Sequence, residues 1–292
     1  MATLASPLRY PGGKAAMAPL LRKVRSLNGL GQHSIAEPFA GGAGAALEML
    51  MGEDTHYIVI NDLDPSIGDF WWALTNQSTR FLRLIDDAPL NIEEWKRQRA
   101  ILKKPWQYSR LRRGFATFYL NRCNRSGIIL NGGPIGGYDQ KGRWKIDARF
   151  NRKRLRERCS RIIEYRDRIQ LSNLDGIQLV EDHADDKTFL FIDPPYYNKG
   201  PKLYLNALDH EYHKRLAGIL GSKQDASWVV TYDDCPEIRA LYENWAQVIS
   251  FGLRYSASGA AQGKEVCIAP QWLQLPDDLE SRRISWIKNH GA

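Results

Sequence analysis

Ser34-Ile35-Ala36-Glu37-Pro38-Phe39-Ala40-Gly41-Gly42-Ala43-Gly44 is the stretch that decides the fold of this 292-residue chain. Its first three residues lead as a short strand into a glycine turn, and residues 45–50 have the composition of a helix start. A strand, a glycine turn and a helix N-terminus together form a cradle for an anionic group. The glycines follow neither Gly-x-Gly-x-x-Gly nor the pattern of a P-loop, because no Gly-Lys-Ser/Thr comes after them.

The turn suits the methionine end of S-adenosylmethionine, with the ligand carboxylate near the backbone amides and the ligand ammonium near an acid. The residues predicted to contact this cofactor are Glu37, Pro38, Phe39, Gly41, Gly42 and Gly44. About twenty residues later, a second apolar strand over residues 57–60 ends in Asn61-Asp62, and an acid at this offset typically holds a ribose diol. Asp62 is therefore the predicted ribose ligand and Asp64 the alternative, although either aspartate could instead cap the helix that Pro65 begins.

A second motif, Asp193-Pro194-Pro195-Tyr196, follows the apolar run Phe189-Leu190-Phe191-Ile192, which predicts a buried parallel strand. Ligands bind at the carboxyl ends of such strands in open α/β sheets. By itself the tetrapeptide would favour a plain rigid turn. Together with the glycine turn, it indicates a catalytic site made of Asp193, Pro194, Pro195 and Tyr196.

These four residues suit the alkylation of an exocyclic amine on a purine, whose lone pair is delocalised into the ring. Asp193 can accept one N–H of the amine, and the carbonyl oxygen of Pro194 can accept the other. The prolines fix the turn and offer no N–H of their own. Tyr196 supplies a flat surface for a base that has left the duplex, at a cost of roughly a few kcal/mol.

The order of these motifs resembles that of the Dam-like DNA adenine-N6 methyltransferases, over roughly residues 6 to 270. The resemblance begins at Arg9-Tyr10-Pro11-Gly12-Gly13-Lys14, although the family more often has tryptophan at the place of Tyr10. It implies that Tyr10 and Lys14 line the cofactor and active-site pocket and that Asp175 lies near the cofactor adenine. It also implies S-adenosylmethionine as cofactor, with S-adenosylhomocysteine as product, and duplex DNA as substrate.

The expected fold is α/β, a Rossmann-like methyltransferase sheet with helices on both faces and an inserted, mostly helical target-recognition subdomain with a β-hairpin. We expect residues 1–80 and 169–270 to form the catalytic domain and 81–168 the insertion. Residues 271–292 form a C-terminal extension without an assigned role. Two later segments, 229–234 and 264–268, match further strands of the sheet.

Charge is divided unevenly along the chain. The whole sequence carries a net charge of +8, yet residues 96–168 hold 22 Lys and Arg against 5 Asp and Glu, a net +17. The remainder holds 19 against 28, a net −9. A solvated helix surface can be this basic, but such asymmetry favours a phosphate-binding surface. DNA affinity should then fall steeply with salt.

Within the insertion, residues 108–123 predict a helix with an apolar side made by Leu111, Phe115, Phe118 and Tyr119, which favours a core role for these aromatics. Asn151 could cap the next helix. Residues 138–144 predict a β-hairpin, and two-stranded ribbons fit the major groove. The predicted DNA contacts are Arg112, Arg113 and Arg122, facing outward from the helix; Asn124 and Arg125; Gln140, Lys141 and Arg143 as base readers; and Arg152 and Lys153 towards phosphates. Loop lysines and arginines can equally contact phosphates or only water.

The composition excludes several other classes. No stretch is apolar enough for a membrane span and no secretory signal begins the chain, so we expect a soluble cytoplasmic protein of prokaryotic or phage type, monomeric in isolation. The four cysteines form no C-x-x-C pair, and methyl transfer from a sulfonium needs no metal, so none is predicted.

Three other functions share parts of this pattern. An RNA adenine-N6 methyltransferase would carry the same catalytic residues. A cytosine-N4 enzyme would more often have serine at the place of Asp193. A non-catalytic DNA-binding or regulatory protein could keep the fold, and a partner endonuclease of a restriction-modification or defence system is compatible with the sequence.

Overall fold

The computed structural model describes residues 5–9, 14–197, 208–254, 262–277 and 284–286. Their strands form one sheet in the order β3-β2-β1-β4-β5-β7-β6-β8. The five neighbours from β3 to β5 pair in parallel, and β7, β6 and β8 pair antiparallel. This confirms the predicted Rossmann-like methyltransferase sheet. The strands are β1 (Ser34–Glu37), β2 (Ile58–Asn61), β3 (Ile169–Ser172), β4 (Thr188–Ile192), β5 (Ser227–Asp233), β6 (Ala246–Arg254), β7 (Gln262–Pro270) and β8 (Ile284–Trp286).

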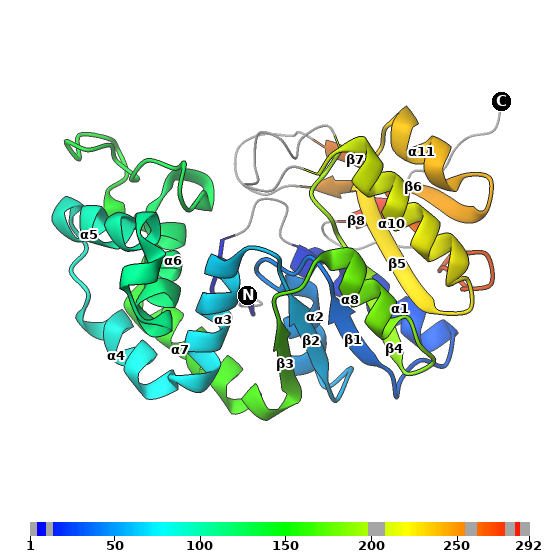
Figure 1. Ribbon diagram of the computed structural model, residues 1–292, viewed down its shortest axis with the longest axis horizontal. Coiled ribbons are helices and arrows are strands. Elements are labelled where there is room, and N and C mark those ends of the chain that lie inside the picture. Colours follow the sequence, from blue (N-terminus) through cyan, green and yellow to red (C-terminus); the bar gives the residue numbers. More distant parts are fainter. Residues whose placement is uncertain (1–4, 10–13, 198–207, 255–261, 278–283, 287–292) are drawn as a thin grey trace.

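The sheet is buried on both faces, as the apolar run at β4 predicts. Phe189 and Phe191 point into one hydrophobic cluster, whereas Leu190 and Ile192 point into the other. Alternate residues of a strand face opposite sides, so a strand covered on both sides is apolar throughout. The helices that pack in the first cluster include α1 (Ala18–Leu27) and α2 (Gly44–Met51); those in the second are α8 (Gly176–His183), α10 (His210–Ser222) and α11 (Pro236–Tyr242) (Figure 1).

The inserted region is a helical lobe beside the β3 edge of the sheet (Figure 1). Its core is aromatic, and Phe118 stacks on Phe70 with ring centroids 6.0 Å apart. Phe81 and Phe115 pack beside them, so the aromatic side of the predicted helix is confirmed as core. The lobe contains α4 (Ser78–Asp87), α5 (Ile92–Lys103), α6 (Arg110–Cys123) and α7 (Arg152–Glu164), and α3 (Pro65–Asn76) joins it to the sheet. Asn151 caps α7 as predicted, accepting the Arg154 N–H at 3.0 Å.

The β-hairpin predicted over residues 138–144 is wrong, because these residues form turns without a strand ladder. The φ angles of Gly136, Gly137 and Gln140 are +87°, +79° and +51°, which bend the chain too tightly for paired strands. The Gln140 side chain also forms hydrogen bonds with the main chain of the loop: its Nε2 donates to the Ile135 and Gly137 carbonyls at 2.8 and 2.6 Å. Its Oε1 atom accepts the Ile146 N–H at 2.9 Å.

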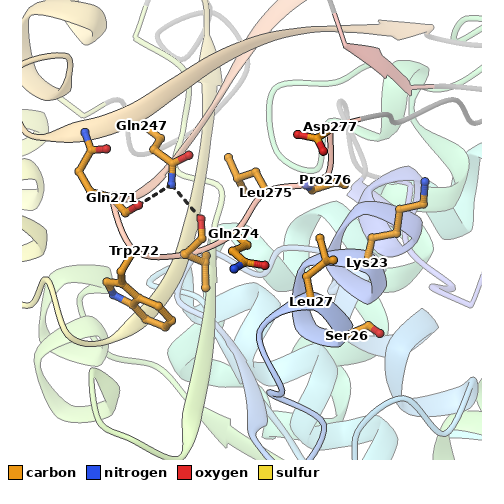
Figure 2. A pocket seen from close by; sticks show the side chains of 11 residues that line it. Lys23, Ser26, Leu27, Gln247, Gln271, Trp272, Gln274, Leu275, Pro276 and Asp277 are labelled. Atoms are coloured by element: carbon orange, nitrogen blue, oxygen red, sulfur yellow. Dashed lines mark hydrogen bonds between the residues drawn. The ribbon is translucent and has the colours of Figure 1, made fainter.

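Part of the C-terminal extension belongs to the sheet, because β8 pairs with β6 at its edge. Residues 271–277 run past the end of α1, where Asn28 exchanges two hydrogen bonds with the backbone of Gln274. A groove of about 710 Å³ lies between α1 and residues 271–277. It is lined by both apolar and amide side chains, among them Leu27, Gln247 and Leu275 (Figure 2). No helix in the described ranges is long and apolar enough to cross a membrane.

Candidate active site

The acids singled out in the sequence lie at the carboxyl ends of neighbouring parallel strands. Glu37 ends β1, Asp62 follows β2, and Asp193 follows β4. Because β2, β1 and β4 are adjacent and parallel, these ends meet along one edge of the sheet. The arrangement is the ligand-binding edge expected of an open α/β sheet.

Asp193 is held by two donors that reach the same carboxylate oxygen. The Thr231 hydroxyl donates to Oδ1 at 2.7 Å, and the Lys14 ammonium lies 3.5 Å from Oδ1. No donor in the described part of the chain bonds to Oδ2. Burial raises the pKa of Asp193 to about 6, against the opposing effects of Lys14 and Thr231. The carboxylate therefore stays largely ionised at neutral pH, and within the described residues its Oδ2 accepts no hydrogen bond.

Lys14 comes from a distant part of the chain and is almost fully buried. It donates to Glu265 Oε2 at 2.7 Å and to the Tyr196 hydroxyl, with its Nζ 4.9 Å from the centre of the Tyr196 ring. Burial alone would lower the pKa of Lys14, but the carboxylates of Asp193 and Glu265 outweigh it, so the pKa is raised. Lys14 is thus a buried cation between two acids.

Glu265 was not identified from the sequence as a site residue. It lies in β7, directly opposite Asp233 of β5, and is 1% exposed. The one signal available is an acid that directly precedes the apolar run Val266-Cys267-Ile268, since a carboxylate in a buried strand needs a partner.

The glycine turn and its acids are tied together by main-chain hydrogen bonds. Gly41 and Ala43 have φ angles of +48° and +47°, so the turn needs the left-handed conformation. Glu37 Oε1 accepts the Ala46 N–H at 2.5 Å, near the start of α2, and burial raises the pKa of Glu37 to about 8. Glu37 therefore stabilises the helix start as well as facing the proposed cofactor edge.

The two aspartates after β2 have different roles. Asp64 caps α3 by accepting the Ser66 N–H at 2.8 Å, which is the capping alternative drawn from the sequence. Asp62 accepts the N–H groups of Gly41 and Asp64 at 2.8 and 2.9 Å, and so joins the end of β2 to the glycine turn. Burial raises the pKa of Asp62 to about 6.

Asp175 lies at the next strand end, after β3. It caps α8 by accepting the Ile177 N–H at 2.9 Å, and it accepts the Tyr212 hydroxyl at 3.0 Å. Phe39 packs so closely on Gly176 that a Cβ there would lie 2.2 Å from the ring. The Phe39 ring of the glycine turn therefore lies against Gly176, the residue that follows Asp175.

Asn61 connects these loops and was quoted from the sequence only as part of a strand end. Its amide donates to the carbonyls of Pro38 and Leu174 at 2.8 and 3.0 Å. Its oxygen accepts from the Ser172 hydroxyl at 2.7 Å and the Leu174 N–H at 2.8 Å. The side chain is fully satisfied, so it acts as a fixed support for the ends of β1, β2 and β3.

The residues at this edge fit the chemistry of S-adenosylmethionine. Its ammonium and ribose hydroxyls need acceptors, and three carboxylates at adjacent strand ends, those of Glu37, Asp62 and Asp175, offer them. Tyr10, the other residue inferred from the resemblance, lies outside the described residues.

The predicted DNA contacts divide into two groups. Five of them are exposed: Arg112, Arg125, Lys141, Arg143 and Lys153. The other five make hydrogen bonds or ion pairs within the fold: Arg113, Arg122, Asn124, Gln140 and Arg152.

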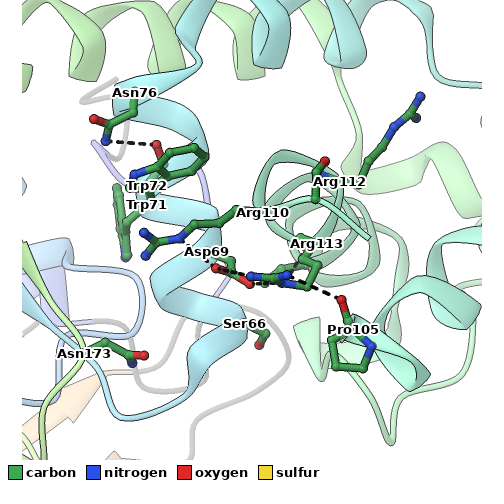
Figure 3. A network of polar contacts seen from close by, with 12 residues as sticks. Ser66, Asp69, Trp71, Trp72, Asn76, Pro105, Arg110, Arg112, Arg113 and Asn173 are labelled. Atoms are coloured by element: carbon green, nitrogen blue, oxygen red, sulfur yellow. Dashed lines mark hydrogen bonds and ion pairs between the residues drawn. The ribbon is translucent and has the colours of Figure 1, made fainter. Parts of the chain in front are cut away.

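The expectation that Arg113 and Arg122 face outward is wrong. Arg113 turns towards Asp69, because that nearly buried acid needs a cation (Figure 3). The Arg122 Nε donates to the Arg149 carbonyl at 2.8 Å, and its pKa is lowered to about 9 by burial and by the cations Arg9 and Arg158. Arg152 likewise points inward, and its guanidinium donates to the Ile85 and Ala88 carbonyls.

Asn124 is also a structural residue of the loop after α6. It is fully buried, accepts the Trp95 indole N–H at 2.6 Å and donates to the carbonyls of Ile128 and Ile129. The start of this loop touches the N-terminal segment, since the Arg9 guanidinium donates to the Asn124 carbonyl at 3.0 Å. The loop that follows α6 is therefore tied to residues near the start of the chain.

Helix α3 contacts both halves of the molecule (Figure 3). Asp69 pairs with Arg110 at 2.9 Å and Arg113 at 2.5 Å, both from α6 of the lobe. Two residues further on, the Trp71 indole donates to the Gly41 carbonyl of the glycine turn at 3.0 Å. One helix thus fixes the lobe and the proposed cofactor turn at once.

Comparison with known proteins gives one family. A family model described as D12 class N6 adenine-specific DNA methyltransferase matches residues 10–257. Two solved structures resemble the chain distantly: a conserved hypothetical protein of Streptococcus pyogenes (10% identity, TM-score 0.33, 86% of this chain and 96% of that chain) and a proposed class I S-adenosylmethionine-dependent methyltransferase of Listeria monocytogenes (11% identity, TM-score 0.39, 96% and 66%). No curated protein matched. The fold is therefore assigned from the strand order, not from these two structures.

Proposed function

Because this chain belongs to the D12 class N6 adenine-specific DNA methyltransferase family, we propose that it transfers a methyl group from S-adenosylmethionine to N6 of a flipped adenine in duplex DNA. The observation that carries this proposal is Asp193, which follows β4: its Oδ1 is bonded by Thr231 and Lys14, and no donor among the described residues bonds to Oδ2. An exocyclic amine needs an acceptor of this kind to localise its lone pair on nitrogen.

The chain would act mainly by positioning the amine. Asp193 accepts one N–H through Oδ2, the Pro194 carbonyl accepts the other, and Tyr196 stacks on the base. Bound S-adenosylmethionine supplies an electrophilic methyl group on a sulfonium. After transfer the amine is cationic, and the Asp193 carboxylate stabilises that charge until the proton leaves.

Three acids would hold the cofactor. We assign Glu37 to the region of its ammonium, Asp62 to the ribose hydroxyls and Asp175 to the neighbourhood of the adenine. The pKa of Glu37, raised to about 8 by burial, means that this side chain is largely protonated at neutral pH unless a cation binds beside it. A cationic ligand at Glu37 would therefore also ionise it.

The predicted insertion, residues 81–168 of the helical lobe, would contact the DNA. The exposed side chains Arg112, Arg125, Lys141, Arg143 and Lys153 are the proposed contacts. Since phosphate contacts release counterions, affinity should fall steeply as salt rises.

The test is methyl transfer from isotopically labelled S-adenosylmethionine to unmethylated duplex DNA or to RNA, followed by mass spectrometry of the nucleosides. We expect labelled N6-methyladenine in DNA, and none from the Asp193→Asn variant, which keeps the size of the side chain. Transfer to RNA alone would replace the proposed substrate. Cofactor binding without transfer to either polymer would support the regulatory alternative.

A further inference from the structure

The contact between Lys14 and Asp193 raises a problem for the proposed reaction. A buried ammonium beside the catalytic carboxylate competes with the amine for the same acceptor. In the structure the competition is partial, because Lys14 Nζ is 2.7 Å from Glu265 Oε2 but 3.5 Å from Asp193 Oδ1. The cation is held mainly by the other acid.

We propose that Glu265 is a positioning residue that keeps the Lys14 ammonium at the Oδ1 side of Asp193, so that Oδ2 stays free to accept the adenine amine. The inference rests on the proposed function for its meaning, since it concerns the acceptor of that amine. It gives a role in this site to a residue of β7, outside the motifs at the ends of β1, β2 and β4.

Among the described residues, the acids that pair with the Lys14 ammonium are Glu265 and Asp193. Both Lys14 and Glu265 are buried, and charge attraction in such a site grows as the distance shortens. Glu265 is fixed by the pairing of β7 with β5, which places it opposite Asp233. Without the Glu265 charge, the nearest carboxylate to the ammonium would be Asp193.

The proposal predicts the direction in which the pKa of Asp193 shifts when Glu265 or Lys14 is replaced. The groups that act on the Asp193 charge are Lys14 from the segment before α1, Thr231 from β5 and Glu265 from β7. The Asp193 charge in turn helps to raise the pKa of Glu37 at the end of β1. Lys14 and Thr231 lower the pKa of Asp193, whereas Glu265 raises it. Removing Glu265 removes the raising charge and lets Lys14 approach, so both changes lower the pKa of Asp193. Removing Lys14 raises it.

The test compares Glu265→Gln with Lys14→Met in the full chain by two measurements. The first is the titration of the Asp193 carboxyl by carbon NMR, assigned by the signal lost in Asp193→Asn. We expect its midpoint to fall by about half a pH unit or more in Glu265→Gln and to rise in Lys14→Met. The second is kcat with DNA, which we expect to fall about tenfold or more in Glu265→Gln while the Kd for S-adenosylmethionine stays within about twofold.

Opposite shifts cannot come from a general loss of packing, which would move both variants alike. An unshifted or raised midpoint in Glu265→Gln, or an unchanged kcat, would overturn the proposal. If Glu265→Gln does not fold, as judged by thermal unfolding, Glu265→Asp takes its place. The shorter acid would hold Lys14 less closely, so the midpoint should shift in the same direction by a smaller amount. The titration needs no turnover, so a wild-type protein that methylates nothing would refute the proposed function separately.

Discussion

The catalytic half and the helical lobe use charged side chains in opposite ways. At the sheet edge, cations and acids from distant segments are buried together, as Lys14, Asp193 and Glu265 are. The lobe carries a large net positive charge, but some of its arginines bind within the fold: Arg122 and Arg152 donate to backbone carbonyls. The charge counted along a sequence is therefore larger than the charge that a ligand can reach.

The largest effect should come from Asp193, whose charge is the centre of the buried cluster. We expect Asp193→Asn to lower kcat by about a thousandfold, because the acceptor of the amine and the counter-charge of the product are both lost. The Kd for S-adenosylmethionine, measured by calorimetry, should change little. Asp186→Asn, the same change at an exposed aspartate in the turn before β4, is the matched control and should keep kcat. A variant Asp193→Asn with wild-type turnover would show that the cluster is not catalytic.

The pH profile tests the same cluster without a mutation. Burial raises the pKa of Asp193 to about 6, and the reactive form is the carboxylate. Because protonation removes the acceptor, kcat/KM for DNA should be full well above pH 6 and fall by about tenfold per pH unit below it. Asp62, with its pKa also raised to about 6, should weaken cofactor binding over the same range. Measuring kcat/KM for DNA at saturating cofactor separates the two, and a flat profile down to pH 5 would contradict the role of Asp193.

The two regions also differed in how far the sequence could predict them. The strand ends carrying Glu37, Asp62 and Asp193 follow from apolar runs and turns, which are local signals, and the sheet was predicted correctly. Glu265 lies 72 residues from Asp193, and only the antiparallel pairing of β7 brings them together. In the lobe, a helix was predicted over residues 108–123 and is found at Arg110–Cys123, but helical spacing cannot tell which arginines find a carbonyl or an acid. The hairpin failed because the Gln140 side chain, not a ladder, satisfies the loop.

The ion pairs between α3 and α6, which connect the sheet to the lobe, should make a contribution of intermediate size, here to the free energy of unfolding. Asp69 of α3 pairs with Arg110 and Arg113. Its side chain is 9% exposed to solvent, against 42% for Arg110 and 26% for Arg113. We expect Asp69→Asn to lower the free energy of unfolding by about 1–3 kcal/mol, since it leaves two cations without their counter-charge. Denaturant unfolding measures this, with Arg112→Ala on the same lobe as the control. Equal free energies of unfolding in both variants would mean that the ion pairs of Asp69 do not stabilise the fold.

The smallest effects on stability and on DNA binding are expected from two adjacent residues, Arg152 and Lys153, and should differ between them. Arg152 donates to the Ile85 and Ala88 carbonyls at the end of α4, so Arg152→Ala should lower the free energy of unfolding by about 1 kcal/mol. Lys153 is exposed, so Lys153→Ala should leave unfolding unchanged and reduce the salt dependence of DNA binding by about one phosphate contact. Unfolding curves and DNA affinities at several salt concentrations measure both. If Arg152→Ala changed the salt slope as much as Lys153→Ala did, the distinction between arginines of the fold and lysines of the surface would fail for this helix.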